Sequence, residues 1–212
     1  MSDALSTYVH RYLPPQGDDP RTLLLLHGTG GDENDLIQLG QMLVPDAGLL
    51  SPRGTVLENG AARFFRRLAE GVFDLDDLRA RTTDLIEFTG AAATAYGFDP
   101  ARVVAVGFSN GANIASSMLL TSPETLSAAA LFRPMVPFVP TQRVPLNGKR
   151  VFIGAGEDDP VVPRDHPYRL AELLQLCGAE VKTEWQPGGH TLTRADVSKA
   201  YEWMEEGRTG SA

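Results

Sequence analysis

Cysteine and long apolar runs are nearly absent from this chain. Its single cysteine, Cys177, excludes an internal disulfide and suits a reducing compartment. No apolar stretch reaches the roughly 20 residues that a membrane-spanning helix needs, and the polar start, residues 1–7, has no apolar signal-peptide centre. We therefore expect a cytoplasmic protein without stable membrane association.

Positive charge is also scarce. Lys and Arg number 19 against 27 Asp and Glu, which gives a formal net charge of −8. Because nucleic acids and anionic membranes attract basic surfaces, both are disfavoured as partners. The length of 212 residues and the hydrophobic content of 42% fit one domain with a sizeable core. We expect that domain to cover residues 1–206 and a frayed tail to cover residues 207–212.

Metal-binding and nucleotide-binding patterns are missing. The acidic run at 74–77 lacks the glycine and distal glutamate of an EF-hand, and no histidine or cysteine set has zinc spacing. The glycine-rich turn at 27–31 lacks the Gly-Lys-Ser/Thr ending of a phosphate-binding loop and the full dinucleotide fingerprint. We therefore expect neither a metal nor a cofactor.

The most informative segment that is present is Gly107-Phe108-Ser109-Asn110-Gly111. It follows the apolar, β-branched run 103–106 and leads into residues 112–120, which have the composition of a buried helix. Gly-x-Ser-x-Gly between a strand and a helix predicts a nucleophile elbow, in which the two glycines permit a sharp turn. Ser109 is therefore the expected nucleophile. A flexible serine-containing turn is the alternative, and both flanking elements disfavour it.

A nucleophilic serine needs a base, and the base needs an orienting acid. Behind such an elbow the chain order is Ser, then Asp or Glu, then His, which leaves His166 and His190. His166 lies at an expected helix start. His190 lies on a glycine-rich loop after the strand-like run 180–185, from which it can reach Ser109. His190 is therefore the expected base.

The acid is expected in the loop 156–163, which follows the strand-like run 150–155. Three consecutive acids, Glu157, Asp158 and Asp159, leave the choice open on chemistry alone. Asp159 precedes a proline, which holds its backbone extended and restricts its side-chain direction. We choose Asp159, with Asp158 as the runner-up.

Two backbone amides are expected to hold the negative oxygen of a tetrahedral intermediate. One belongs to Asn110, directly after the nucleophile. The other is expected from the turn that follows the strand-like run 22–26, where the Thr29 amide is the candidate. His27 is expected to brace this turn rather than to transfer protons.

Apolar runs alternate with helical patterns along the chain, which predicts an α/β fold with a mostly parallel central sheet and helices on both faces. Strands are expected at 8–12, 22–26, 48–51, 103–106, 128–131, 150–155 and 181–185. Helices are expected at 34–43, 75–96, 111–121, 167–177 and 194–205.

Two long connections, at 52–74 and 132–148, leave the sheet on the side of the elbow. Neither is long enough for a separate lid domain, which favours small or soluble esters over lipids. The role of their arginines, Arg63, Arg66 and Arg67, stays open. The residues expected to line an apolar substrate pocket are Phe64, Phe65, Phe132 and Met135. For the phenylalanines, packing within the loops is an equally weighted alternative.

The chain resembles the phospholipase/carboxylesterase family of α/β-hydrolases, which includes the acyl-protein thioesterases, and is most similar to its bacterial carboxylesterases linked to hydroquinone resistance. The resemblance implies an α/β-hydrolase fold with an antiparallel first strand. It assigns the acid to the aspartate of Asp-Pro-x-Val-Pro, here Asp159. Acyl-protein thioesterases have glutamine after the serine, where this chain has Asn110. The matching segments run in family order at 25–33, 51–54, 63–67, 107–113, 156–163 and 189–190.

These residues predict a serine carboxylesterase that hydrolyses small or short-acyl esters through an acyl-enzyme. Thioesterase or lysophospholipase activity at the same site is the alternative. A non-catalytic, ligand-binding hydrolase fold is disfavoured because Ser109, Asp159 and His190 are all present. The expected partner is a small-molecule ester, and a homodimer stays open.

Overall fold

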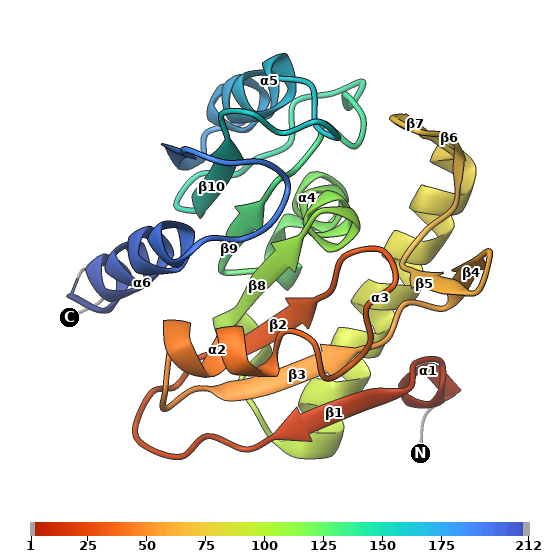
Figure 1. Ribbon diagram of the computed structural model, residues 1–212. Helices are drawn as coiled ribbons and strands as arrows, with labels where there is room; N and C mark the ends of the chain where they lie inside the picture. Colours follow the sequence, from red (N-terminus) through yellow and green to blue (C-terminus); the bar gives the residue numbers. More distant parts are fainter. Residues whose placement is uncertain (1–2, 210–212) are drawn as a thin grey trace.

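A seven-stranded sheet forms the centre of the computed structural model, which describes residues 3–209. The strand order is β1-β3-β2-β8-β9-β10-β11 (Figure 1). β1 runs antiparallel to β3 and the other neighbours are parallel, so the expected antiparallel first strand is confirmed. The strands are β1 (His10–Leu13), β2 (Thr22–Leu26), β3 (Gly48–Pro52), β8 (Val103–Phe108), β9 (Ala128–Phe132), β10 (Arg150–Gly156) and β11 (Glu180–Gln186).

Helices cover both faces of the sheet, as an α/β-hydrolase fold requires. Helices α3 (Leu75–Tyr96), α4 (Asn110–Thr121) and α5 (Asp165–Leu176) supply side chains to one apolar core. Helices α2 (Ile37–Leu43) and α6 (Arg194–Thr209) supply side chains to the other. Short helical turns complete the set: α1 (Asp3–Ser6), η1 (Pro100–Arg102) and η2 (Pro123–Thr125).

Strand β2 shows why the central strands are continuously apolar. Leu24 and Leu26 belong to the core under α3, α4 and α5, whereas Leu23 and Leu25 belong to the core under α2 and α6. All four side chains have 0% exposure. Because successive side chains of a strand point to opposite faces, a strand covered on both sides needs an apolar residue at every position. The fold follows from this pattern.

Two small hairpins interrupt the connection between β3 and α3, and neither was expected from the sequence. They pair β4 (Val56–Glu58) with β5 (Ala61–Arg63), and β6 (Arg67–Ala69) with β7 (Val72–Phe73). They extend away from the central sheet in Figure 1. The turn between β4 and β5 is Asn59-Gly60, with φ of 52° and 85°. Asn-Gly is a strong hairpin signal, so the first hairpin was detectable.

Four helices differ from the expected bounds: α4 and α5 by one or two residues at an end, α2 and α6 by three or more. Helix α2 begins at Ile37 rather than at residue 34, because Asp32 accepts the Asn34 N–H at 2.7 Å and forms a local turn instead. Helix α6 continues to Thr209, so the expected frayed tail is helical at 207–209, and 210–212 lie outside the described residues. No helix within 3–209 is both long and apolar enough to cross a membrane.

Candidate active site

The turn between β8 and α4 has the shape expected of a nucleophile elbow. Ser109 has φ 51° and ψ −112°, a left-handed backbone that a non-glycine residue rarely adopts. A Cβ on Gly107 would lie 2.7 Å from backbone atoms of Ala112, and one on Gly111 would collide with the carbonyl group of Leu26. Both glycines are therefore required for the chain to turn here.

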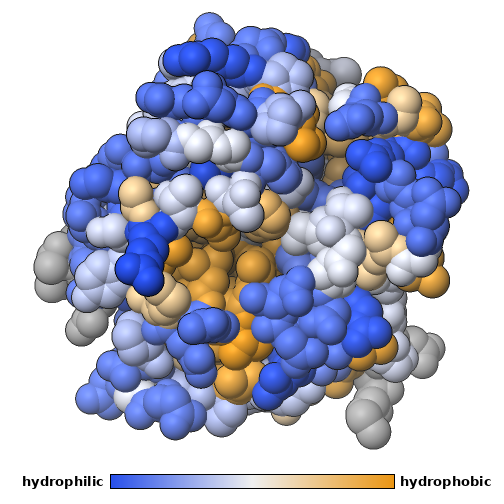
Figure 2. Space-filling model, viewed as in Figure 1, coloured by the Kyte–Doolittle hydropathy of each residue, from blue (hydrophilic) through white to orange (hydrophobic). Residues whose placement is uncertain are grey.

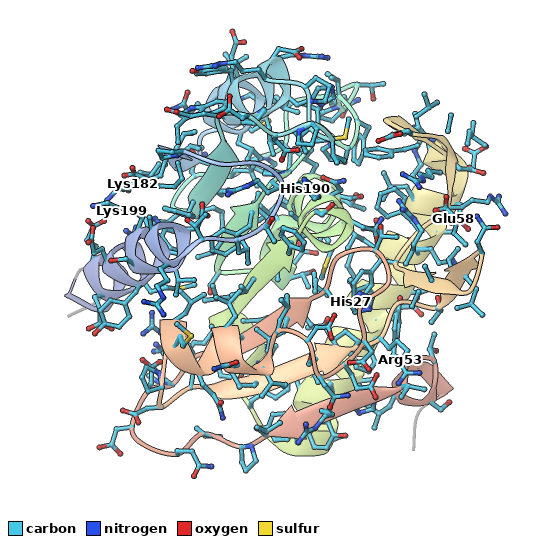
Figure 3. All side chains as sticks on the ribbon, viewed as in Figure 1. His27, Arg53, Glu58, Lys182, His190 and Lys199 are labelled. Atoms are coloured by element: carbon cyan, nitrogen blue, oxygen red, sulfur yellow. The ribbon has the colours of Figure 1, made fainter. Side chains whose placement is uncertain are left out.

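Three side chains meet at this turn through a continuous series of hydrogen bonds. His190 Nε2 lies 2.9 Å from Ser109 Oγ. His190 Nδ1 lies 2.8 Å and 3.1 Å from the two carboxylate oxygens of Asp159. When Nδ1 carries the proton and donates it to Asp159, Nε2 is free to accept the serine proton. Figure 3 shows His190 near the middle of the viewed face.

The structure distinguishes Asp159 from its neighbour. The Asp159 side chain is 3% exposed, and its Oδ1 also accepts the N–H groups of Val161 at 2.8 Å and Val162 at 3.0 Å. Asp158 is exposed, and its own N–H donates to the Gly188 carbonyl at 3.0 Å. Only a carboxylate held by its own loop has a fixed direction. The geometry therefore favours Asp159 over Asp158 as the partner of His190.

The turn after β2 is held from several sides. His27 Nδ1 donates to Gly28 O at 2.6 Å, and Nε2 accepts the Gly54 N–H at 2.9 Å. Burial lowers the pKa of His27, in agreement with a neutral ring that uses one nitrogen as an acceptor. Thr29 Oγ1 accepts from Arg63 at 2.7 Å, and Gly30 N donates to Ala62 O at 2.9 Å. His27 thus braces the turn, and the oxyanion role of the Thr29 amide stays a prediction.

Two asparagines of α4 anchor the two long connections. Asn110 Oδ1 accepts the Phe64 N–H at 2.7 Å, and Asn113 Oδ1 accepts the Met135 N–H at 2.7 Å. The residues are 2% and 5% exposed. Because positions three apart share a helix face, one side of α4 holds both connections against the elbow. Sequence reasoning assigned Asn110 a backbone role and missed both side-chain contacts.

The expected apolar substrate slot is wrong for this structure. Phe64, Phe65 and Phe132 have 0% exposure, and Met135 has 6%. Phe64 packs on His27 with ring centroids 4.7 Å apart, and Phe132 packs on Phe152 at 5.8 Å. The alternative of packing within the loops holds for Phe64 and Phe65, because the anchored main chain directs these rings into the core. A loop sequence alone does not reveal that direction. Phe132 is the last residue of β9 and packs against the neighbouring strand.

The arginines of the first connection stabilise it. Arg63 is 4% exposed and contacts Thr29, the Phe65 carbonyl and, at 3.2 Å, Glu58. Arg67 also pairs with Glu58, and Arg66 pairs with Asp74 on the surface. All three arginines therefore form ion pairs or hydrogen bonds with other residues of the chain.

A second buried arginine was missed entirely. Arg133, directly after β9, forms a fully buried ion pair with Asp196 in the first turn of α6. Its guanidinium also donates to the carbonyls of Gly189 and Thr191, on both sides of His190. Positions 133 and 196 form no local motif, so only the tertiary structure brings them together.

Two hollows are found in the structure, one between two helices and one at the amino ends of the strands. An apolar pocket of about 570 Å³ lies between α2 and α6, lined in part by Met42, Leu192 and Val197. Leu192 follows His190 by two residues in the chain, and none of Ser109, Asp159 and His190 lines this pocket. Figure 2 shows apolar residues gathered between these two helices.

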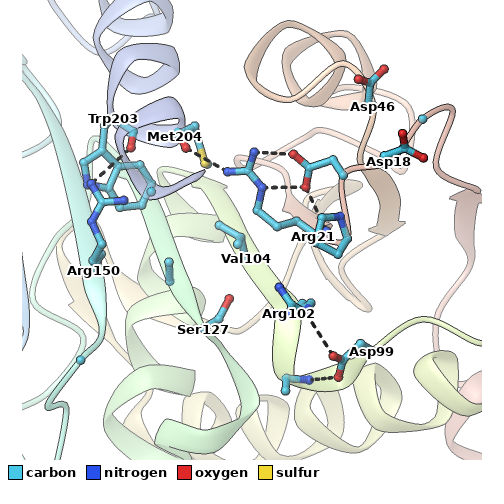
Figure 4. A pocket seen from close by; sticks show the side chains of 17 residues that line it. Asp18, Arg21, Asp46, Asp99, Arg102, Val104, Ser127, Arg150, Trp203 and Met204 are labelled. Carbon is cyan, nitrogen blue, oxygen red and sulfur yellow. Dashed lines mark hydrogen bonds and ion pairs between the residues drawn. The ribbon is translucent and has the colours of Figure 1, made fainter. Parts of the chain in front are cut away.

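The other hollow is a cavity of about 920 Å³ at the amino ends of the strands, shown in Figure 4. Its arginines are already engaged: Arg21 pairs with Asp19 at 2.6 Å, Arg102 pairs with Asp99 at 3.4 Å, and Arg150 lies over Trp203. Ser109 lies beyond the opposite end of β8, so this cavity is not part of the candidate site. Within residues 3–209, no group of three histidine, cysteine or acidic side chains could hold a metal.

Comparisons with known proteins identify the family of the chain. A model of the family described as Phospholipase/Carboxylesterase matches residues 72–206. The protein MhqD of Bacillus subtilis (strain 168), whose name describes it as a hydrolase, is 46% identical over 196 residues, which is 92% of this chain and 98% of MhqD. The crystal structure of a Bacillus cereus carboxylesterase matches with a TM-score of 0.92 and 44% identity, over 97% of this chain and 99% of that chain. A carboxylesterase from Mesorhizobium loti matches with a TM-score of 0.89 and 32% identity, over 94% and 95% of the two chains.

Proposed function

Because the chain belongs to the phospholipase/carboxylesterase family of α/β-hydrolases, we propose that it hydrolyses carboxylic esters through an acyl-enzyme on Ser109. The observation that carries the proposal is the series of hydrogen bonds from Asp159 through His190 to Ser109. The family makes the chain an ester hydrolase, and this geometry supports the roles of the three residues.

In the first half of the reaction, His190 Nε2 takes the Ser109 proton as Oγ attacks the ester carbonyl carbon. The carbonyl oxygen becomes negative, and the amides of Thr29 and Asn110 stabilise it. The carbon–oxygen bond to the alcohol then breaks, and His190 gives its proton to the leaving oxygen. The product is an ester between the acyl group and Ser109.

In the second half, water enters and His190 removes one of its protons as the water oxygen attacks the acyl carbon. The bond to Ser109 breaks, Oγ regains a proton from His190, and the acid leaves. Asp159 keeps the imidazole in the required tautomer and stabilises its charged form throughout. Its hydrogen bonds from Val161 and Val162 support this role, because they restrict the movement of the carboxylate.

For the substrate, we propose small or short-acyl esters. The support is that the phenylalanines leave no deep slot for a long acyl chain, while the apolar surface of the pocket of about 570 Å³ begins at Leu192, two residues after His190 in the chain. Thioester cleavage would use the same residues with a better leaving group, and it is an outcome of the substrate test.

The test of the proposed function is labelling by a serine-directed fluorophosphonate, followed by mass spectrometry of the modified peptide. We expect a single adduct on Ser109 and no adduct in a folded Ser109→Ala variant. The loss of turnover in that variant should be on the order of 10⁴–10⁶-fold. A chain that neither labels nor hydrolyses esters would be a ligand-binding protein instead.

A further inference from the structure

We infer that Arg133, anchored by Asp196, is a positioning residue that holds the loop of His190 in the geometry that ester hydrolysis needs. The inference rests on the proposed function, because it acts through His190. The inference extends the proposed function by assigning a role to a buried ion pair that takes no part in the proton transfers themselves.

The loop of His190 needs an external anchor. His190 follows Gly188, which has φ 128°, and Gly189. Glycine loses more conformational freedom on ordering than other residues, so a loop with two consecutive glycines does not define the position of His190 by itself. Yet the ring must satisfy Asp159 and Ser109 at once, with contacts of 2.8 Å and 2.9 Å.

The Arg133 side chain supplies that anchor. Its Nε donates to Gly189 O at 3.0 Å, and one terminal nitrogen donates to Thr191 O at 3.2 Å. These are the residues immediately before and after His190. A planar guanidinium with donors in a fixed fork can hold two carbonyls in a defined relative position, which a flexible ammonium cannot do.

Asp196 fixes the guanidinium in turn. Its two carboxylate oxygens each accept from a different terminal nitrogen of Arg133 at 2.8 Å, and both side chains are 0% exposed. Asp196 also accepts the Thr193 N–H at 2.8 Å, while its own N–H donates to Thr193 Oγ1 at 3.2 Å. This reciprocal pair is the arrangement of a helix capping box. The start of α6 and the His190 loop therefore share one anchor.

The backbone of Arg133 connects this anchor to the other two members of the site. Arg133 has φ 54°, an uncommon value for a long side chain, and its N–H donates to Gly154 O at 2.8 Å. The preceding carbonyl, Phe132 O, accepts the Ser109 N–H at 2.8 Å. Ser109, the end of β10 that leads to Asp159, and the His190 loop are thus all tied to one short segment.

Close contact between the two loops adds to the need for accurate placement. A Cβ on Gly156 would lie 2.8 Å from Gly188 O and would collide with Gly189 O. The His190 loop therefore rests directly on the backbone that leads into the Asp159 loop. Arg133 Nε, which donates to Gly189 O, would also lie 3.1 Å from that Cβ, so Arg133, Gly156 and Gly189 meet at one point.

A purely stabilising role is the competing explanation. Removing two charges from water is costly, and replacing a buried ion pair by uncharged residues is often neutral or favourable for stability. A pair kept only for stability would therefore show its effect in unfolding and not in the placement of His190. The two explanations make different predictions for a variant that has no buried charge.

The experiment compares Arg133→Met/Asp196→Asn with the wild-type chain. The double variant leaves no unpaired charge, and the new asparagine can still accept the Thr193 N–H, so we expect it to fold. We expect kcat for a small p-nitrophenyl ester to fall about 10²-fold with little change in KM, as for a misplacement of about 1 Å. Arg133→Lys should not restore kcat, because lysine lacks the fork.

The matched control is Arg150→Met. Arg150 also ties the sheet to α6, through the Trp203 carbonyl at 3.3 Å, but near the opposite end of that helix. This variant should keep the wild-type kcat. It reports the effect of losing an arginine that contacts α6 at a point distant from His190.

Proton NMR gives a readout that does not depend on turnover. A downfield resonance from the His190 Nδ1 proton reports its hydrogen bond to Asp159. We expect it in the wild type and in Arg150→Met, and we expect it to broaden or vanish in Arg133→Met/Asp196→Asn. Wild-type kcat with an intact resonance in the double variant would overturn the inference, as would a loss of kcat fully explained by the unfolded fraction. Failure of the proposed function would differ: the wild type would show the resonance and remain inactive and unlabelled.

Discussion

The carboxamide oxygen of Asn110 lies 2.7 Å from the amide nitrogen of Phe64, so the residue after the nucleophile also holds the connection that leads out of β3. That connection braces the turn of Thr29 through Arg63 and through the contact of Gly54 with His27. The two proposed oxyanion donors, Asn110 and Thr29, are therefore linked by contacts that do not involve substrate.

This link predicts the effect of Asn110→Ala. The variant leaves the buried Phe64 N–H without an acceptor, which should cost about 1–3 kcal/mol of stability. Asn113→Ala is the matched control, because it removes the equivalent bond to Met135 N from the same helix face. Urea unfolding should show similar losses for both. If the bond also supports the oxyanion site, kcat should fall further in Asn110→Ala, and equal kcat values would contradict that support.

The choice of acid predicts an asymmetry between two adjacent aspartates. Asp159→Asn should lower kcat by about 10⁴-fold, because an amide favours the wrong imidazole tautomer. Asp158→Asn should have a small effect, since Asp158 is exposed and its contact to Gly188 uses the backbone. Initial rates with one activated ester suffice for the comparison. A larger loss of kcat in Asp158→Asn than in Asp159→Asn would show that Asp158, not Asp159, is the acid that orients His190.

Chain-length dependence tests the substrate proposal. Each buried methylene contributes about 0.8 kcal/mol, so kcat/KM should rise with acyl length until the pocket beside Leu192 is filled. We expect the rise to end at short chains in a series of p-nitrophenyl esters from acetate to palmitate. Leu192→Ala should reduce the gain per methylene, and thioester analogues of the same acyl groups test the alternative leaving group. A maximum at long chains, or activation at a lipid surface, would favour a lipase or an acyl-protein thioesterase.

The buried ring of His27 predicts a loss of stability in acid. Burial lowers the pKa of His27, so the folded state favours the neutral ring more than the unfolded chain does. As pH falls, the unfolded state binds the proton first, so the free energy of unfolding should decline below the ordinary histidine pKa of about 6.5 and be constant well above it.

Urea titrations between about pH 8 and about pH 5.5 measure this slope. His27→Gln supplies an uncharged acceptor for the Gly54 N–H, so its slope should be shallower. His166 is the control site: burial also lowers the pKa of His166, whose Nδ1 accepts the Val136 N–H at 3.1 Å. An unchanged slope in His27→Gln would mean that other groups account for the acid response.

The order of strands and helices could be predicted because it depends on local patterns. Thr22 is followed by four consecutive leucines at 23–26, and β2 has the expected bounds, as does α3 at Leu75–Tyr96. The hairpins were missed because their strands have two or three residues, too few for a periodic pattern. The pairing of the two strands in each hairpin depends on the turn that joins them rather than on a periodic pattern of apolar residues within a strand.

Ser109 could be proposed as the nucleophile from sequence because an elbow needs glycine at two fixed positions. His190 could be proposed from chain order, and Asp159 from the proline that follows it. The sequence by itself therefore determined the fold class and the residues that meet at the candidate site. It did so because sharp turns and strands covered on both faces restrict residue types locally.

Only the tertiary structure decided what surrounds those residues. Phe64 and Met135 were expected in a pocket and are buried, because the direction of a side chain from a loop depends on distant anchors such as Asn110 and Asn113. The pairing of Arg133 with Asp196 spans 63 positions and leaves no local pattern. Long-range contacts of this kind depend on the packing of the whole chain. They cannot be predicted from local sequence because burial and charge pairing are properties of the folded state.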